Sequence, residues 1–332
     1  MSKHLLYKGS VIALTVFQFL VLQFAFLPNS EQFANAQAAP FTSMSVTVAN
    51  GRLSFKGAVA TSGYINTTTL RIAASGQPDN DTRNLFNGDA ICVNPSGDIC
   101  HQQLTHPVNY LATDNITFGV STAFPHDIAN ATPLVASQSG RIIVSFRPRV
   151  AVPAGGSIRV YIPANATNTT AQNGIPDADG FDSARIDNIS AGSFGSVVVP
   201  SFTTTAASIT YTHASSNHVF SVPVTTTPLN TSTTYYITIG DAAADRQLFV
   251  NPAPCLTCQS GGTAHTTRGL ADPYNFRVES LDASSNLQDS TTTSVAVNDG
   301  VLVSVTVPLS LTYQISAVTA STALSCPGVS GG

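Results

Sequence analysis

Five cysteines are the residues of this chain whose spacing most directly suggests chemistry. Four of them form two close pairs, Cys92 with Cys100 and Cys255 with Cys258, and Cys326 stands apart. A disulfide within each pair would staple a loop, and the segment inside the first pair, VNPSGDI, is rich in turn-forming residues. We therefore predict the disulfides Cys92–Cys100 and Cys255–Cys258, with Cys326 left to pair elsewhere or to stay free.

Two other chemistries use cysteines at such spacings. Zinc could be held by both cysteine pairs, or by the first pair together with His101 and His106. A redox site would use the second pair, which is a C-x-x-C motif. Such motifs act at the start of a helix in a βαβ unit, and the residues around Pro254 do not predict one. The disulfide interpretation is therefore the leading one.

Four aspartates gather in the segment NGIPDADGFDSARID, where carboxylates and a Gly-containing loop suit a calcium ion. They are Asp177, Asp179, Asp182 and Asp187. The segment does not match an EF-hand, which needs glycine and glutamate at fixed positions. Asp and Gly are also the usual residues of turns, so the alternative is a solvated loop. Calcium is the only cofactor that the sequence suggests besides the zinc alternative.

Catalytic signatures are scarce. The sequence has no H-E-x-x-H motif and no phosphate-binding loop, and beyond residue 40 it holds a single glutamate, Glu279. A Ser-His-Asp triad assembled from distant loops stays open as an alternative, because geometry and not sequence position defines it. We predict a protein that is not an enzyme.

The composition indicates which elements must position these residues. Charged residues make up 10% of the chain, and beyond residue 40 there is one lysine, Lys56. Good helix formers are therefore rare on the surface, whereas the abundant Thr, Val, Ile, Phe and Tyr suit strands. A net charge of −4 without a basic cluster argues against nucleic acid or an anionic membrane surface as a partner.

Alternation of apolar and polar residues predicts many short strands. Two runs carry hairpin signals, one at Asn50–Gly51 and one at residues 298–300 (Asn-Asp-Gly). Short strands without a helical period predict sandwiches or barrels. Nine further runs lie between turn residues: TTLRIAA, NITFGVS, GRIIVSF, GSIRVYIPA, SITYTH, NHVFSVPV, TTYYITIG, RQLFV and YNFRVESLD.

The chain begins like an exported protein. Lys3 and Lys8 precede an apolar run over residues 11–27, and small residues follow in an A-x-A pattern, which predicts cleavage after Ala36 or Ala38. The alternative is a retained membrane anchor, since the run approaches the length that spans a bilayer. After residue 40 no apolar run is long enough to span a membrane.

We predict an all-β chain with two tandem Ig-like antiparallel β-sandwich domains after an N-terminal signal peptide. A long irregular insertion is expected at residues 76–113 and a shorter one at residues 251–272. The predicted segments are 1–38 for the signal peptide, 39–195 and 196–318 for the two domains, and 319–332 for a linker or truncated C-terminus.

Three segments support this organisation by resemblance. NHVFSVPVTTTPLNTSTTYYITIG, YNFRVESLDASSNLQDSTTTSVAVNDGVLVSVTVPLSLTYQIS and GGSIRVYIPANATNTTAQNGIPDADGFD are similar to segments of uncharacterised exported proteins of ultrasmall uncultivated bacteria. The first two resemble the paired Ig-like or fibronectin-type repeats of those proteins. The resemblance implies export and fold, and it carries no site residues.

These observations predict an exported, non-enzymatic structural or interaction protein of the cell surface, the N-terminal part of an assembly or stalk. Its partners would be copies of itself or other surface proteins. One alternative is an adhesin that contacts a glycan or a protein through the stapled loops. A secreted hydrolase on a β scaffold is a further alternative, because fold does not fix function.

Overall fold

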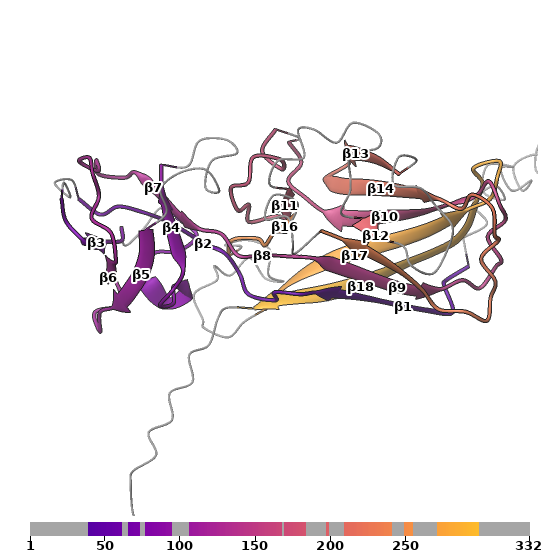
Figure 1. Cartoon of the computed structure of the whole chain (residues 1–332), viewed down its shortest axis with the longest axis horizontal. Coiled ribbons are helices and arrows are strands. Elements are labelled where there is room, and N and C mark those ends of the chain that lie inside the picture. The colour runs from indigo at the N-terminus through magenta and orange to yellow at the C-terminus, as the bar shows by residue number, and fades with distance from the viewer. Residues whose placement is uncertain are drawn as a thin grey trace, which may run out of the picture. The chain divides into compact units, whose positions relative to one another are not determined.

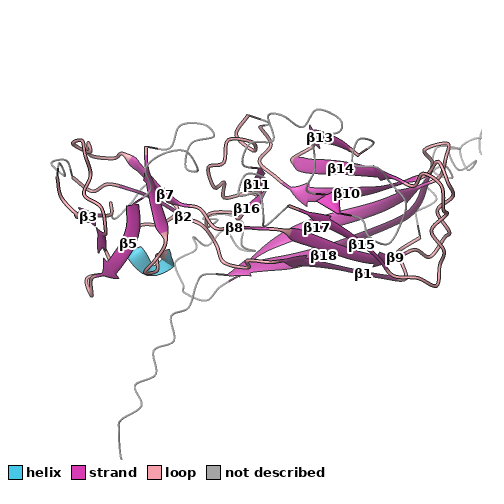
Figure 2. Cartoon of the chain, in the orientation of Figure 1, coloured by secondary structure: helices cyan, strands magenta, loops and turns pink. Residues whose placement is uncertain are grey.

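The described part of the chain consists of strands and loops, with one short 3₁₀ helix, η1, at Thr82–Asn84 (Figure 2). This confirms the predicted all-β class. Within these residues no helix has the length and apolar character needed to cross a membrane. The structure is a computed structural model that describes residues 39–61, 66–73, 77–94, 106–167, 169–183, 197–198, 209–240, 249–254 and 271–298.

Two antiparallel sheets form a β-sandwich (Figure 1). The first has four strands in the order β1 (Ser43–Val48), β9 (Ile142–Arg147), β15 (Tyr235–Ile239) and β12 (Val197–Val198). The second has five strands in the order β13 (Thr210–Ala214), β14 (Asn217–Pro223), β10 (Ser157–Pro163), β17 (Ala271–Leu281) and β18 (Leu287–Asn298).

The alternation seen in the sequence builds the core between these sheets. Every second residue of β10 is buried, namely Ile158, Val160 and Ile162, and β9 alternates in the same way. Phe220 from β14 and Phe276 from β17 belong to the same core cluster. Each such side chain stabilises the fold by about 1.5–3 kcal/mol when it is fully buried.

Between β1 and β9 the chain forms a second unit of β structure, residues 55–136, which we call the inserted lobe. It has its own core, which includes Phe55, Leu70, Ile91, Phe118 and Leu134. Its strands form one six-stranded sheet in the order β2 (Phe55–Ala58), β7 (Pro133–Ala136), β4 (Ala90–Val93), β5 (His106–Leu111), β6 (Thr117–Val120) and β3 (Thr69–Arg71).

The inserted lobe is tied to the sandwich by polar contacts near its two ends. Before the lobe, the buried Asn251 donates from Nδ2 to the carbonyl oxygens of Asn50 and Arg52, and the Ser54 hydroxyl donates to the Asn251 carbonyl over 2.7 Å. After the lobe, the Asn251 N–H donates to the Gln138 carbonyl over 2.7 Å. The Arg52 guanidinium pairs with Asp89 of the lobe. A small third sheet includes β16 (Phe249–Val250), which ends directly before Asn251. Its strands lie in the order β11 (Asp182–Ser183), β16 and β8 (Ser139–Gly140).

The strand pairing differs from the predicted division into two sandwiches at residue 195. β9 pairs with β15, and β10 pairs with β14 and β17, so strands from both sides of that position share the same sheets and core. By their contacts the described residues between 39 and 298 belong to one compact unit. The predicted irregular insertion at residues 76–113 also contains two strands, β4 and β5. Alternation predicts strands, but it does not predict which strands become neighbours.

The hairpin prediction at Asn50–Gly51 is wrong, because β1 pairs with β9 and β2 pairs with β7. A two-residue hairpin turn instead joins β13 and β14 at Ser215 and Ser216, whose φ angles are 50° and 59°. Positive φ at both positions is the geometry of a type I′ turn, which usually selects Asn and Gly. The other predicted turn, at residues 298–300, extends beyond the described residues.

The nesting of the lobe leads to a test by deletion. Replacing the inserted lobe, residues 55–136, by a short Gly-Ser linker should leave a chain that folds, because the β1–β9 pairing and the sandwich core remain. A fragment that ends at residue 195 should not form the sandwich, because β9 loses β15 and β10 loses both of its partners, β14 and β17. Circular dichroism and thermal unfolding measure both outcomes. Cooperative unfolding of the fragment would contradict the nested arrangement.

Candidate functional site

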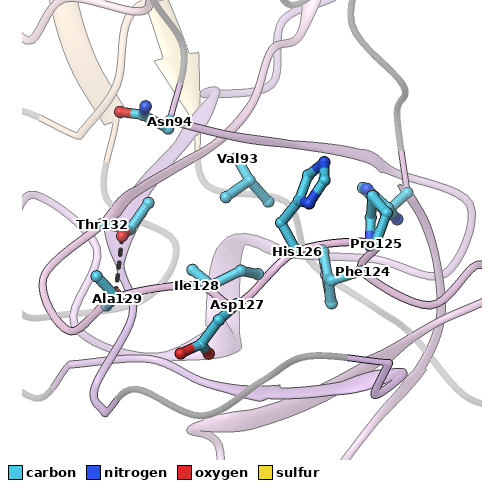
Figure 3. Close-up of a pocket in the computed structure, with 10 residues that line it drawn as sticks. Val93, Asn94, Phe124, Pro125, His126, Asp127, Ile128, Ala129 and Thr132 are labelled. Atoms are coloured by element: carbon cyan, nitrogen blue, oxygen red, sulfur yellow. Dashed lines mark hydrogen bonds between the residues drawn. The ribbon is translucent and has the colours of Figure 1, made fainter.

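A pocket of about 440 Å³ lies in the inserted lobe (Figure 3). Its volume falls within the range of roughly 300–1,000 Å³ that is usual for small-molecule sites. It is lined by residues from the end of β4, the start of β5 and the loop between β6 and β7: Val93, Asn94, His106, Phe124, Pro125, His126, Asp127, Ile128, Ala129 and Thr132.

The β6–β7 loop supplies most of this lining, and hydrogen bonds hold its shape. The Phe124 N–H donates to the Thr67 carbonyl over 3.1 Å, which fixes one end of the loop to the segment before β3. The Thr132 hydroxyl donates to the Ala129 carbonyl over 2.7 Å near the other end (Figure 3). The loop wall is therefore formed before any ligand binds.

His106 is the buried polar residue of the pocket, with 4% of its surface exposed. Its ring packs against the Phe124 ring with centroids 4.3 Å apart, and Nδ1 lies 2.8 Å from the Thr122 carbonyl oxygen. Because a carbonyl only accepts, Nδ1 carries the proton. In the neutral imidazole, Nε2 is then a hydrogen-bond acceptor.

The lining combines an apolar floor with an exposed polar rim. Phe124 and Ile128 are buried, whereas His126 and Asp127 are exposed. Such a pocket can hold an apolar or aromatic group by burial of its surface, while the rim contacts a polar end of the same molecule. The arrangement is suited to binding.

The predicted disulfides lie mostly outside the described residues, as do Cys100, His101, Cys255, Cys258 and Cys326. Cys92 is the exception: it is buried in β4, where it pairs with Val135 of β7. The pairing with Cys100 stays a prediction. Among the described residues no three His, Cys, Asp or Glu side chains are grouped to hold a metal, so the zinc alternative gains no support there.

The described aspartates of the predicted calcium site are not grouped to hold a metal, and each makes separate contacts with the protein. Asp182 accepts hydrogen bonds from the N–H groups of Gly174 and Asn173, at 2.7 and 3.3 Å. Asp179 is exposed and accepts from the Asn165 side-chain amide. Asp177 is buried beside Lys56. The fourth aspartate, at position 187, lies outside the described residues.

A buried polar chain passes through the sandwich. The Tyr211 hydroxyl donates to Nδ1 of His218 over 2.8 Å, and Nε2 of His218 donates to the Phe181 carbonyl over 2.9 Å. Burial lowers the pKa of His218 to about 4 and keeps the ring neutral. Asp182 and Ser183 follow Phe181 directly and are also fully buried. A substrate cannot reach these buried Ser, His and Asp side chains. We therefore assign this hydrogen-bonded series of residues a structural role.

The fold and the pocket thus define an all-β protein with a sandwich and an inserted, pocket-bearing lobe. No protein-family model matches the chain, and no curated protein matches it in sequence.

Sequence reasoning missed the pocket. Residues 124–128, FPHDI, match no motif, and their role depends on β4 and β5, which were expected to be irregular. A Pro-containing apolar and charged run between two strands was the only available signal.

The buried histidine gives a pH dependence whose sign follows from its pKa. Below about pH 6.5 the unfolded chain takes up a proton at His218, while the folded chain does so only near pH 4. This residue should therefore lower the free energy of unfolding by roughly 3 kcal/mol as the pH falls through that interval.

Urea unfolding of the wild type and of His218→Gln at several pH values measures this contribution. The wild type should lose stability relative to the variant as the pH falls, whereas the exposed-site control His126→Gln should follow the wild type. Parallel curves for the wild type and His218→Gln would contradict the assignment.

Proposed function

We propose that the chain is an exported structural or interaction protein of the cell surface without enzymatic activity. The observation that carries this proposal is the inserted lobe, which presents a preformed pocket and is anchored in the sandwich at both ends. Loops held by a rigid β scaffold are common binding sites. Its partners would be copies of itself or other surface proteins.

Export is supported by the sequence at the N-terminus and by the predicted cysteine pairing. The charged start, the apolar run over residues 11–27 and the A-x-A pattern are typical of a signal peptide, although they lie outside the described residues. The disulfide that we predict between Cys92 and Cys100 would fit the same location, since disulfides persist mainly in oxidising compartments. A location outside the cytoplasm accounts for both features.

Expression of the full chain in a bacterial host tests export directly. We expect the protein in the exported fraction, with an N-terminus at Gln37 or Ala39 when the intact mass is measured. An Ala36→Asp and Ala38→Asp double variant should retain the uncleaved N-terminus, because signal peptidase requires small residues there. A wild-type protein that stays in the cytoplasm with its first 36 residues attached would overturn this part of the proposal.

The second candidate function is an adhesin-type binding module that contacts a glycan or a protein. It is favoured by the position of Cys92, since the next two residues, Val93 and Asn94, line the pocket. The loop that we expect the Cys92–Cys100 disulfide to staple thus begins at the pocket wall. The apolar floor and the His126–Asp127 rim would contact an apolar group that carries a polar end.

A blocked pocket tests the binding function. Ala129 is exposed and lines the pocket, so Ala129→Trp should fill it without changing the melting temperature. On glycan and protein arrays we expect Ala129→Trp to bind at least about tenfold more weakly than the wild type. This corresponds to a loss of about 1.4 kcal/mol of binding free energy. Ala154→Trp, at an exposed turn of the sandwich, is the matched control and should bind like the wild type. Equal binding by all three proteins would show that the pocket is not the contact site.

A further inference from the structure

Lys56, the only lysine beyond residue 8, lies in β2 of the inserted lobe beside a buried carboxyl of the sandwich. Its Nζ donates to the Pro176 carbonyl over 2.7 Å and lies 4.0 Å from Oδ1 of Asp177. The Asp177 side chain is 6% exposed, and its Oδ2 is buried without a hydrogen-bond partner. An amine and an incompletely satisfied carboxyl are therefore held side by side.

Backbone hydrogen bonds fix this juxtaposition. The Ser54 N–H donates to the Pro252 carbonyl over 2.8 Å, and the Ala253 N–H donates to the Asp177 carbonyl over 2.9 Å. The buried segment 251–254 thus joins the chain before Lys56 to the loop that carries Asp177. Neither residue needs a backbone movement to meet the other.

The rest of the Asp177 loop is also restrained. The Tyr274 hydroxyl donates to the Ala178 carbonyl over 3.0 Å. Gly180 packs so closely that a Cβ there would lie 2.5 Å from the backbone of Ala164. The loop therefore keeps Asp177 in place, and the flexible lysine side chain supplies the remaining movement.

We propose that Lys56 and Asp177 condense to an intramolecular isopeptide bond that cross-links the inserted lobe to the sandwich. The lone pair of the uncharged Nζ attacks Cγ of the protonated Asp177 carboxyl, and a C–N bond forms. The C–OH bond then breaks, and the hydroxyl leaves as water after taking one proton from Nζ. The products are one secondary amide and one water, so no oxidant, reductant or cofactor is needed.

The surroundings favour the reacting protonation states. Burial raises the pKa of Asp177 to about 7, against the opposing effect of Lys56, so an appreciable fraction of the carboxyl is protonated near neutral pH. Burial also raises the pKa of the neighbouring Asp182, and Asp177 raises it further. Two such carboxyls resist ionising together. Transfer of a proton from the partly exposed lysine ammonium to Asp177 removes the buried carboxylate charge without any exchange with solvent.

The isopeptide bond would strengthen the connection between the inserted lobe and the sandwich. Hydrogen bonds at Asn251 and Ser54 can open under force or at high temperature, whereas an amide cannot. This inference does not depend on the proposed function, because it concerns residues away from the pocket.

Peptide mapping of the purified full chain tests the proposal. The protein is held near neutral pH, denatured, reduced and digested with trypsin. We expect no cleavage after Lys56, and a joined species of peptides Leu53–Arg71 and Val160–Arg185 that is lighter than their sum by one water. Recovery of the separate peptides, with cleavage after Lys56 and no joined species, would overturn the proposal.

Three variants assign the bond to its residues. The joined species should disappear in Lys56→Arg, because a guanidinium stays protonated, and in Asp177→Ala, which lacks the carboxyl. It should persist in Asp179→Ala, which removes the exposed neighbouring carboxyl. These comparisons also separate the cross-link from loss of water elsewhere in the chain. A joined species that persists in Asp177→Ala would show that another residue is the acceptor.

Discussion

The register of β1 against β9 is the constraint on which the rest of the structure depends. Val48 pairs with Ile142, and the Ala49 N–H donates to the Arg141 carbonyl over 2.9 Å. The chain therefore leaves the sandwich and returns to it at neighbouring points. A long excursion between such points costs little more closure entropy than a short one, so a complete sheet with its own core can be accommodated there. The pocket lies in this inserted segment, so its position relative to the sandwich depends on the pairing of β1 with β9.

The connection between the two β units relies on buried polar groups more than on a shared apolar core. Two core clusters are separate in the described residues, one in the sandwich and one in the inserted lobe. Between them, the side chain of Asn251 and the hydroxyl of Ser54 satisfy backbone groups that would otherwise be buried without partners. Such contacts are directional, so they fix orientation as well as proximity. An unmade hydrogen bond at this place would cost more than a formed one contributes.

Alternation in the sequence predicted strand existence well and strand partners poorly. All nine quoted runs contain strand residues, because period-two burial is a local property that each strand carries in its own residues. Pairing is not local: Asn50–Gly51 has the best hairpin signal, yet the chain there passes from the sandwich to the lobe. Ser215 and Ser216 form a tight hairpin turn without a glycine, because β13 and β14 impose the twist. The pocket could not be predicted because its wall combines a loop after β6 with the end of β4.

Charge is scarce in this chain, and the sandwich and lobe bury several of the few ionisable groups. Asp79, Asp182, Asp272, Glu279 and Asp289 are among the buried residues, as is Asp177. Burial of a carboxylate is costly unless hydrogen bonds or an opposite charge compensate it. Asp182 accepts two backbone N–H groups, and Asp289 accepts those of Arg149 and Val150. Asp177 has one buried oxygen without a hydrogen-bond partner and an amine nearby, so loss of its charge through the proposed reaction would relieve this cost.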